Sequence, residues 1–354
     1  MEDSFAEQII PGTFIRVQAE ALIAPKGVAS GNVGIVGTAA NAAGGANVLN
    51  TTQILSSLED AARLYAPSDP LAAGTLNLRR SLELLFRNGA TTVYARGLPA
   101  GATTTDFGTA VDELVKEDVN LLVAPELTTA NGLDVLRPAV NSAETNARDI
   151  IAVVGSDAST VANIKAQVVA DKRVVLCAPG VVVGGTVLPG NYTSAAVGGL
   201  IASLAVQSSP TNKVLPAVSG LSQKFSYGQL KDLLQGNVLP LESRQGIRVV
   251  RGITTEGAAF TQITTRRIVD YAKAGIRQVS NQFIGRLNNE RVRKALAGAL
   301  DGFLATMRVD ESLVDYELEV KASRQDEIAG RCVVNVAMQP TFSIDYIRVT
   351  LALS

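Results

Sequence analysis

The sequence contains no histidine and no tryptophan, and aromatic residues occupy only 5% of its 354 positions. Histidine is the commonest general base, a frequent metal ligand and the usual partner of a catalytic serine or cysteine. Its absence excludes most hydrolase designs, whereas Ser/Lys and carboxylate chemistries stay open. The shortage of aromatic rings also leaves few platforms on which nucleic acid bases or sugars could stack.

Cysteines, long apolar runs and net charge are also scarce. Cys177 and Cys332 lie in apolar stretches without metal-ligand spacing, so we expect both to be buried free thiols. No stretch approaches the ~18 to 20 apolar residues of a membrane-spanning helix, and we expect no direct membrane insertion. The opening Met-Glu-Asp-Ser lacks the pattern of a secretory signal, which predicts synthesis in the cytoplasm. A formal net charge of -1 gives no general attraction to nucleic acid.

The run Gly31-Asn-Val-Gly34-Ile-Val-Gly37 comes nearest to a cofactor motif. Its spacing is GxxGxxG, which differs from the dinucleotide-binding GxGxxG, and no helical pattern opens directly after it. Close packing of a strand and a turn, which glycine permits, is the simpler interpretation. Phosphate-loop, HExxH, GxSxG and calcium-loop motifs do not occur. We therefore predict no catalytic, cofactor-binding or metal-binding residue.

The first half of the chain alternates short apolar runs with segments of helical periodicity. Such alternation predicts an α/β layer with parallel strands. The strands are expected at residues 33–37, 92–96, 120–124, 150–154 and 173–178. An Ala- and Gly-rich segment, 192–206, is expected to form the tightly packed helix that closes this unit.

After a connector near residue 208, the longest helical patterns occupy 260–284 and 289–307. The period then changes from helix to strand. Apolar and charged residues alternate, a polar turn follows at 323–330, and a second apolar alternation begins. This pattern predicts an antiparallel hairpin whose apolar face carries Tyr316, Leu318, Val320, Val334 and Val336.

Each end of the chain has a strand pattern without a local partner. The N-terminal pattern includes Phe14, Ile15 and Val17. The C-terminal pattern changes parity near Tyr346, which predicts a bend or bulge there. Its apolar members are Phe342, Ile344, Ile347, Val349 and Leu351. Lone strands do not fold by themselves, so we expect both ends to pair with something distant.

Charge is unevenly distributed along the chain. Residues 244–308 contain twelve Lys/Arg against four Asp/Glu, whereas 106–172 contain eleven Asp/Glu against five Lys/Arg. Solvated faces would explain this pattern. Complementary assembly, in which basic faces of one copy meet acidic faces of another copy or of a tube, would explain it as well.

A series of short motifs runs in order from near the start of the chain to its end. The motifs are Ile10-Pro11-Gly12-Thr-Phe14, Pro216-Ala-Val-Ser-Gly-Leu221, Gly246-Ile-Arg-Val-Val-Arg-Gly252-Ile-Thr254-Thr, Thr265-Arg-Arg267-Ile-Val-Asp270-Tyr271, and the closing positions Gly330, Pro340 and Ile347. Together they resemble the tail sheath family of contractile phages, R-type bacteriocins and extracellular contractile injection systems. No single motif is diagnostic, but their order and spacing together are. Arg251 and Thr254 stand where the family's G-x-x-x-x-W-G-A-R-T strand has tryptophan and arginine.

The resemblance implies a structural subunit that polymerises as a helical cylinder around an inner tube and contracts to drive the tube through a target envelope. The implied fold is α/β (α+β), with a C-terminal sheath domain of long helices and a β-hairpin, an inserted α/β domain, and extended strand arms at both ends. We expect an N-terminal linking arm at 1–22, an outer domain at 23–207, an inner core-assembly domain at 208–339 and a C-terminal linking arm at 340–354.

The expected partners are further copies of the chain in stacked hexameric rings, an inner tail tube, and baseplate and tail-terminator or cap proteins. No cofactor and no nucleic acid is expected. In this scheme the hairpin accepts arms from neighbours, and the basic second unit faces the tube through Arg291, Arg293 and Lys294. The subunit would be made and assembled in the bacterial cytoplasm and become part of a phage tail or a released contractile particle. Two alternatives remain: a nucleotide-binding α/β enzyme, and a non-contractile scaffold or shell protein.

Overall fold

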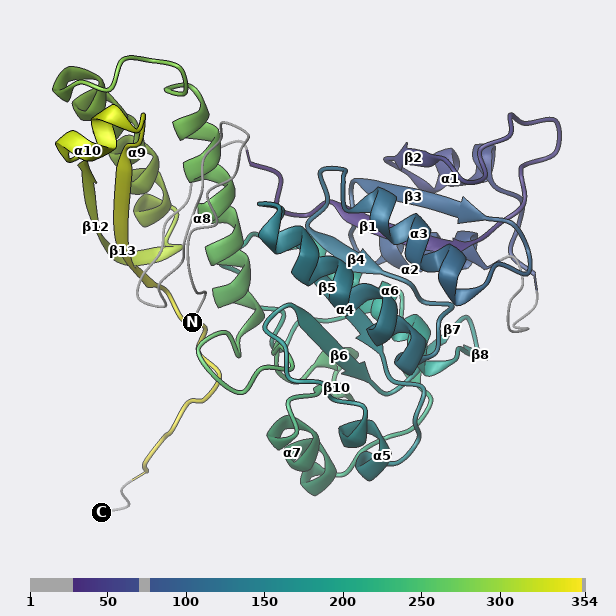
Figure 1. The fold of residues 1–354 in the computed structure, drawn as a ribbon. Coiled ribbons are helices and arrows are strands. Elements are labelled where there is room, and N and C mark those ends of the chain that lie inside the picture. Colours follow the sequence, from purple (N-terminus) through teal and green to yellow (C-terminus); the bar gives the residue numbers. More distant parts are fainter. Residues whose placement is uncertain (1–27, 70–76, 352–354) are drawn as a thin grey trace.

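The computed structural model describes residues 28–69 and 77–351 (Figure 1). The strands are β1 (Val33–Thr38), β2 (Thr52–Leu55), β3 (Val93–Leu98), β4 (Leu121–Val123), β5 (Ile151–Gly155), β6 (Val174–Ala178), β7 (Val181–Val183), β8 (Thr186–Val187), β9 (Gly220–Leu221), β10 (Leu239–Ser243), β11 (Ile247–Val249), β12 (Leu313–Lys321) and β13 (Val333–Pro340). The helices are α1 (Leu58–Leu64), α2 (Leu78–Arg87), α3 (Thr104–Leu114), α4 (Thr129–Thr145), α5 (Val161–Ala166), the 3-10 turn η1 (Gly190–Tyr192), α6 (Thr193–Ser203), α7 (Tyr227–Gln235), α8 (Ile263–Asn281), α9 (Glu290–Val309) and α10 (Arg324–Ile328).

An eight-stranded sheet forms the centre of the larger part, in the order β11-β10-β6-β5-β4-β1-β3-β2. Its five central strands, β6, β5, β4, β1 and β3, run parallel to one another, as the five apolar runs predicted. Antiparallel β2 forms one edge, while β10 adds parallel to β6 and β11 closes the other edge. Because β10 and β11 come from residues beyond 207, the sheet draws on both sides of the domain boundary expected there. The division of the chain into domains stays a prediction.

Helices cover both faces of this sheet, which explains why its strands read as continuous apolar runs. α2 and α6 pack against the face that presents Val33 and Ile35. α3 and α4 cover the other face, where Val36 is buried. Gly199 lets α6 approach α2 closely, because a Cβ there would lie 2.5 Å from the carbonyl oxygen of Leu85. The expected closing helix at 192–206 is therefore present as α6.

A second, smaller core lies on the far side of α8, which separates it from the sheet (Figure 1). It consists of apolar side chains from α8, α9 and the β12–β13 hairpin, with Leu300, Leu304 and Met307 of α9 buried. The two long helical patterns correspond to α8 and α9, with ends shifted by a few residues. The expected polar turn at 323–330 contains the short helix α10, which begins with a capping box at Ser323 and Asp326.

Strands β7 and β8 are joined by the exposed pair Gly184 and Gly185, with φ angles of 56° and 83°. Positive φ at both central residues is the geometry of a type I′ hairpin turn, which glycine adopts without strain. A Cβ built on either glycine would have nothing within 4 Å. The turn lies on the opposite side of the molecule from the β12–β13 hairpin (Figure 1).

Both cysteines are free, but only Cys177 is buried. Burial raises the pKa of its thiol, whose sulfur lies 3.3 Å from the carbonyl oxygen of Val154. The expectation that Cys332 is buried was wrong, because this residue lies in the exposed stretch between α10 and β13. Within the described part of the chain, every helix is too short or too polar to span a membrane.

Candidate functional site

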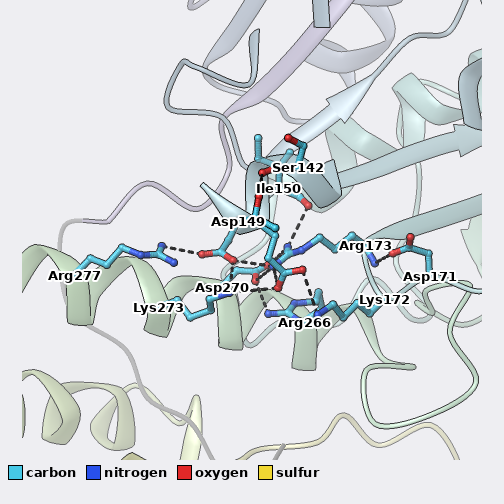
Figure 2. A network of polar contacts seen from close by, with 12 residues as sticks. Ser142, Asp149, Ile150, Asp171, Lys172, Arg173, Arg266, Asp270, Lys273 and Arg277 are labelled. Atoms are coloured by element: carbon cyan, nitrogen blue, oxygen red, sulfur yellow. Dashed lines mark hydrogen bonds and ion pairs between the residues drawn. The ribbon is translucent and has the colours of Figure 1, made fainter. Parts of the chain in front are cut away.

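One face of α8 places four charged side chains in the interior, between the helix and the sheet (Figure 2). Arg266, Asp270, Lys273 and Arg277 follow each other at intervals of four, three and four residues, which aligns them on one helix face. Their side chains retain 1%, 11%, 3% and 15% of their exposure, respectively. Apolar residues of α8 fill the opposite face, so the helix is buried on both sides.

The larger part contributes the partners of these charges from helix α4, from the loop just before β5 and from the residue before β6. The fully buried Arg173 donates through Nη2 to Glu144 and to Asp149, each at 2.7 Å. Through Nη1 it donates to Asp270 of α8 at 3.0 Å and to the carbonyl oxygen of Ile150 at 3.2 Å. Arg173 therefore bridges carboxylates from both sides of the interface.

The remaining contacts close the network around the same carboxylates. Asp149 receives Lys273 Nζ at 2.7 Å and Arg277 Nη1 at 2.8 Å, while Asp270 receives Arg266 Nη2 at 2.6 Å. We call the set Glu144, Asp149, Arg173, Arg266, Asp270, Lys273 and Arg277 the charge joint. A buried charge is tolerated when it is paired and hydrogen-bonded. Every charged group of the charge joint has at least one such partner, although the buried Nε atoms of Arg173, Arg266 and Arg277 have none among the described residues.

Two carboxylates of the charge joint, Asp149 and Glu144, are held ionised. Burial alone would raise the pKa of Asp149, but Lys273, Arg173 and Arg277 outweigh burial and lower it to about 2. At Glu144, burial likewise raises the pKa, while the hydrogen bond and the charge of Arg173 lower it. The net effect is a lowered pKa of that carboxyl. Such groups stabilise the fold above their unfolded pKa values, and this contribution is lost as the pH falls toward the folded ones.

Arg267, next to the charge joint, is satisfied in a different way. Its donors meet main-chain carbonyls, at 2.8 Å to Leu204, 3.1 Å to Ala205 and 3.0 Å to Ser30. Burial lowers the pKa of its guanidinium to about 10. Arg267 thereby fixes the segment after α6 and the entry to β1 against α8.

Sequence reasoning missed the charge joint, since it counted these side chains as part of a basic surface. Arg266, Arg267 and Lys273 are buried, and Arg277 is half-buried. Their acidic partners include Glu144 and Asp149 from the acidic stretch. Part of the charge asymmetry along the chain is therefore complementarity within one molecule. The available signal was the 4-3-4 spacing of charges on a helix whose other face is apolar.

The predicted hairpin is present. β12 and β13 pair antiparallel over Leu313 to Lys321, and Tyr316, Leu318, Val320, Val334 and Val336 pack against the small core, as their alternation predicted. The Tyr316 hydroxyl donates to Asp301 of α9 at 2.7 Å, which fixes the hairpin on that helix. Among the described residues, no third strand pairs with either outer edge. Each edge therefore presents unpaired backbone groups.

The C-terminal arm residues lie beyond this hairpin on an extended segment that runs away from the body (Figure 1). Their exposed fractions range from 61% to 84% for Phe342, Ile344, Ile347, Val349 and Leu351. Exposed apolar side chains of this size, gathered along one segment, are typical of an interaction surface. The N-terminal arm residues Phe14, Ile15 and Val17 lie outside the described residues.

The three candidate tube contacts lie in the first turn of α9, but in different environments. Arg293 is half-buried and donates to Asn288 Oδ1 and to Glu327 Oε1, each at 3.0 Å. Lys294 is exposed and forms an i,i+4 pair with Glu290 at 2.7 Å. Arg291 is exposed. Arg291 and Lys294 therefore face solvent, whereas Arg293 ties α9 to α10.

The sheet order places a topological switch point between β1 and β4, where α/β enzymes bind nucleotides beyond the strand ends. Here the side chain of Glu126 occupies that position. It accepts hydrogen bonds from the Thr38 backbone N–H at 2.8 Å and from the Thr38 hydroxyl at 2.6 Å. A Cβ on Gly37 would lie 2.6 Å from Glu126 Oε1, so this glycine serves close packing, as its motif spacing indicated. Burial raises the pKa of Glu126 to about 7.

Comparison with known proteins agrees along most of the chain. Residues 100–255 match the phage tail sheath protein central domain, and residues 255–354 match the phage tail sheath C-terminal domain. No curated protein matches the sequence.

Solved structures share the fold at low sequence identity. A chain in the six-fold symmetrised baseplate of the anti-feeding prophage is 18% identical with a TM-score of 0.78, covering 98% of this chain and 99% of that one. The contracted helical sheath of the same system gives 17% identity and a TM-score of 0.74, covering 98% and 100%. The contracted PVC sheath of an extracellular contractile injection system gives 15% identity and a TM-score of 0.74, covering 99% of both chains.

Proposed function

Because this chain belongs to the phage tail sheath family and is a structural subunit of a contractile sheath, we propose that its hairpin and its C-terminal arm link neighbouring copies. The carrying observation is that one molecule has both halves of such a link. Among the described residues both edges of the β12–β13 sheet are open, and the arm past Tyr346 is an extended segment with exposed apolar side chains.

The two halves fit each other chemically. An arm that adds to an edge of the hairpin exchanges backbone hydrogen bonds and buries alternate side chains such as Val349 and Leu351. Ordering a free arm costs about 1 to 2 kcal/mol per residue in backbone entropy, so the strand must be paired to be held in place. The N-terminal arm, with Phe14, Ile15 and Val17, is proposed to add in the same way from another copy. Together they would complete a four-stranded sheet at each junction.

The body is proposed to move as one rigid unit during contraction. The charge joint supports this, because sliding the sheet along α8 would separate buried charges, each of which would then lack a partner. We assign the outer role to residues 23–207 and the inner, assembling role to 208–339, with linking arms at 1–22 and 340–354. β10 and β11, which belong to the inner segment in sequence, join the outer sheet and strengthen the connection.

The tube is proposed to meet the exposed start of α9. Arg291 and Lys294 support this assignment because they face solvent near the α8–α9 loop. Arg293 is better assigned to holding α10, given its bond to Glu327. Further partners are proposed to be other copies in stacked rings, baseplate proteins and a terminator or cap. The particle would be assembled in a bacterial cytoplasm and then form part of a phage tail or a released injection device.

We propose further that the chain acts without catalysis. Its α/β layer resembles those of nucleotide-binding enzymes in topology, but a carboxylate occupies the switch point where a phosphate would need positive charge or N–H donors. Purified protein with nucleotide-dependent turnover above background would contradict this assignment. Unchanged thermal stability on addition of nucleotide would agree with it.

The decisive test is assembly on tubes. Co-expression with the tube protein of the same particle should give cylinders in two pitches by electron microscopy, extended and contracted. Removal of residues 347–354 should leave a folded monomer by circular dichroism and abolish the cylinders. A scaffold or shell protein would instead give polymers of a single pitch. Full-length cylinders from the truncated chain would contradict the linking role of the arm.

A further inference from the structure

The segment between the hairpin and the free arm is attached to the body by its polar side chains. Along Phe342 to Tyr346, Ser343 and Asp345 face the body, while Phe342, Ile344 and Tyr346 point outward with 61%, 79% and 73% exposure. An ordinary surface strand buries its apolar side. The reversed orientation here shows that hydrogen bonds and charge hold this segment.

The main contact is between Asp345 and residues near the start of α8. Arg251 Nε donates to Asp345 Oδ2 at 2.7 Å, with 25% and 7% of the two side chains exposed. Gln262 Nε2 donates to the same oxygen at 3.0 Å, and the Thr211 hydroxyl donates to Oδ1 at 3.4 Å. Three separate segments of the body therefore converge on one carboxylate. Arg251 is also the residue that stands in place of the family's tryptophan.

Ser343 extends this attachment. Its backbone N–H donates to Gln262 Oε1 at 3.2 Å, and its carbonyl oxygen accepts from Gln262 Nε2 at 3.3 Å. The side-chain amide of Gln262 thus pairs with Ser343 as a neighbouring strand would. The hydroxyl groups of Thr264 and Ser343 lie 3.1 Å apart. We call Thr211, Arg251, Gln262, Thr264, Ser343 and Asp345 the clasp.

We propose that the clasp takes up the pull on the C-terminal arm and thereby protects the β12–β13 hairpin. This inference rests on the proposed function, in which a neighbouring copy holds the arm. Without the clasp, a pull on the arm would act on the end of β13, where Pro340 pairs with Leu313 and the Thr341 N–H donates to Ser312 at 3.1 Å. Those contacts would break one after another, starting from that end.

The position of the clasp explains why such protection matters. A pull on the arm would separate β13 from β12. The β12–β13 hairpin, however, is the proposed acceptor for the arms of neighbouring copies. With Asp345 bound to Arg251 and Gln262, the pull passes instead to the body, at the N-terminal end of α8 through Gln262 and at the loop of Arg251. The free arm then begins at Ile347, the point at which the apolar pattern changes parity and the side-chain contacts with the body end in the described chain.

Hydrogen exchange tests the protection. In wild-type sheaths, amides of β13 should exchange no faster than in the monomer. Asp345→Asn loses the charge pair with Arg251. In sheaths of this variant, the β13 amides should exchange at least tenfold faster than in wild-type sheaths. In the variant monomer, they should exchange at the same rate as in the wild-type monomer. Asp315→Asn is the matched control, because its exposed pair with Arg308 is longer, at 3.7 Å, and lies outside the clasp. Equal protection in Asp345→Asn and wild-type sheaths would overturn the proposal.

Two insertions locate the root of the arm without weakening any contact. A Gly-Ser pair between Tyr346 and Ile347 lengthens the free arm and should change the axial repeat of the cylinder or block its growth. The same pair between Thr341 and Phe342 lies between the hairpin and the clasp, so the free arm keeps its length and the axial repeat should stay unchanged. An equal effect of both insertions, or no effect of the outer one, would refute the clasp. If the wild-type chain forms no cylinders in the same preparation, the proposed function fails instead.

Discussion

The charge joint and the chain end beyond the hairpin treat polar and apolar groups in opposite ways. At the charge joint, ionised side chains that ordinarily seek water are buried, and each finds its partner within the same molecule. At the chain end, Ile347, Val349 and Leu351 are exposed, although such side chains ordinarily lie in a core. The first region is complete in one copy of the chain. In the proposed function, the second becomes complete only when another copy is added.

The difference separates stability from assembly, so the two properties should respond to different mutations. Changes in the charge joint should lower the free energy of unfolding of the monomer. Changes in the arm should leave that free energy almost unchanged and abolish polymerisation. A variant that altered both properties together would show that the two regions are coupled.

The largest effect is expected from Val349→Pro. Proline removes a backbone donor and fits poorly inside a paired strand, so cylinders should disappear by electron microscopy. Val349 is exposed, and within the described part of the monomer its backbone N–H makes no hydrogen bond that proline would break. The free energy of unfolding should therefore change by no more than about 0.5 kcal/mol, as for other surface substitutions. Val349→Thr, which keeps the β-branched shape, is the control and should still assemble. Sheaths of normal length from the proline variant would show that the arm is not a paired strand.

Arg173→Met tests the charge joint directly. The substitution removes a cation that holds Glu144, Asp149 and Asp270, and breaking a buried ion pair from one side typically costs about 3 to 5 kcal/mol. Urea denaturation of the monomer should show a loss of that size. Arg63→Met, which breaks an exposed i,i+3 pair with Asp60, is the control and should stay within about 0.5 kcal/mol of the wild type. A similar, small change in both variants would contradict a structural role of the charge joint.

Titration of the monomer should separate two kinds of carboxyl. Glu126 has a pKa raised to about 7, so its contribution to stability is present below its unfolded pKa of about 4.5 and is lost as the pH rises through 7. Glu126→Gln should therefore remove a decline of about 1 to 3 kcal/mol between pH 5 and pH 8, the range that a shift of this size allows. Asp149 behaves in the opposite way, with stability lost below about pH 4. If Glu126→Gln keeps the same decline, another group causes it.

The smallest effect is expected at the start of α9. Arg291→Glu combined with Lys294→Glu should slow growth on tubes several-fold, because rim charges act mainly on the rate of encounter. Stability of the monomer should hardly change, as both side chains are exposed. The same double reversal at Arg63 and Arg87, which are also exposed, is the control for net charge. Equal growth rates of the two double variants would remove the tube assignment from α9.

The strands and helices of the larger part were predictable because each apolar run was buried on both faces and bounded by turn residues. β1 and β6 fall within one residue of the expected runs. β2, β10 and β11 were not expected as part of this sheet, since short edge strands depend on neighbours that are distant in sequence. The hairpin was predictable from the strict alternation around Leu318 and Val336.

The candidate sites were harder to predict, because they depend on pairs that no local pattern connects. Arg173 lies 97 residues from Asp270 and Arg251 lies 94 from Asp345, so neither pair follows from periodicity. The sequence did contain one trace of the clasp. The alternation of apolar residues shifts by one position near Tyr346, which indicated a bend. In the structure, the clasp ends at Asp345, directly before this residue, and Arg251 lies over the Tyr346 ring.

The turn between β7 and β8 offers a place to display foreign peptides on the particle. Gly184 and Gly185 already have positive φ, and the space around them is open, so an insertion there meets no packed side chain. The turn is remote from the hairpin and from the arm (Figure 1). Every copy in a cylinder would then present one insert, at a density set by the helical lattice, while both halves of the intersubunit link keep their native sequence.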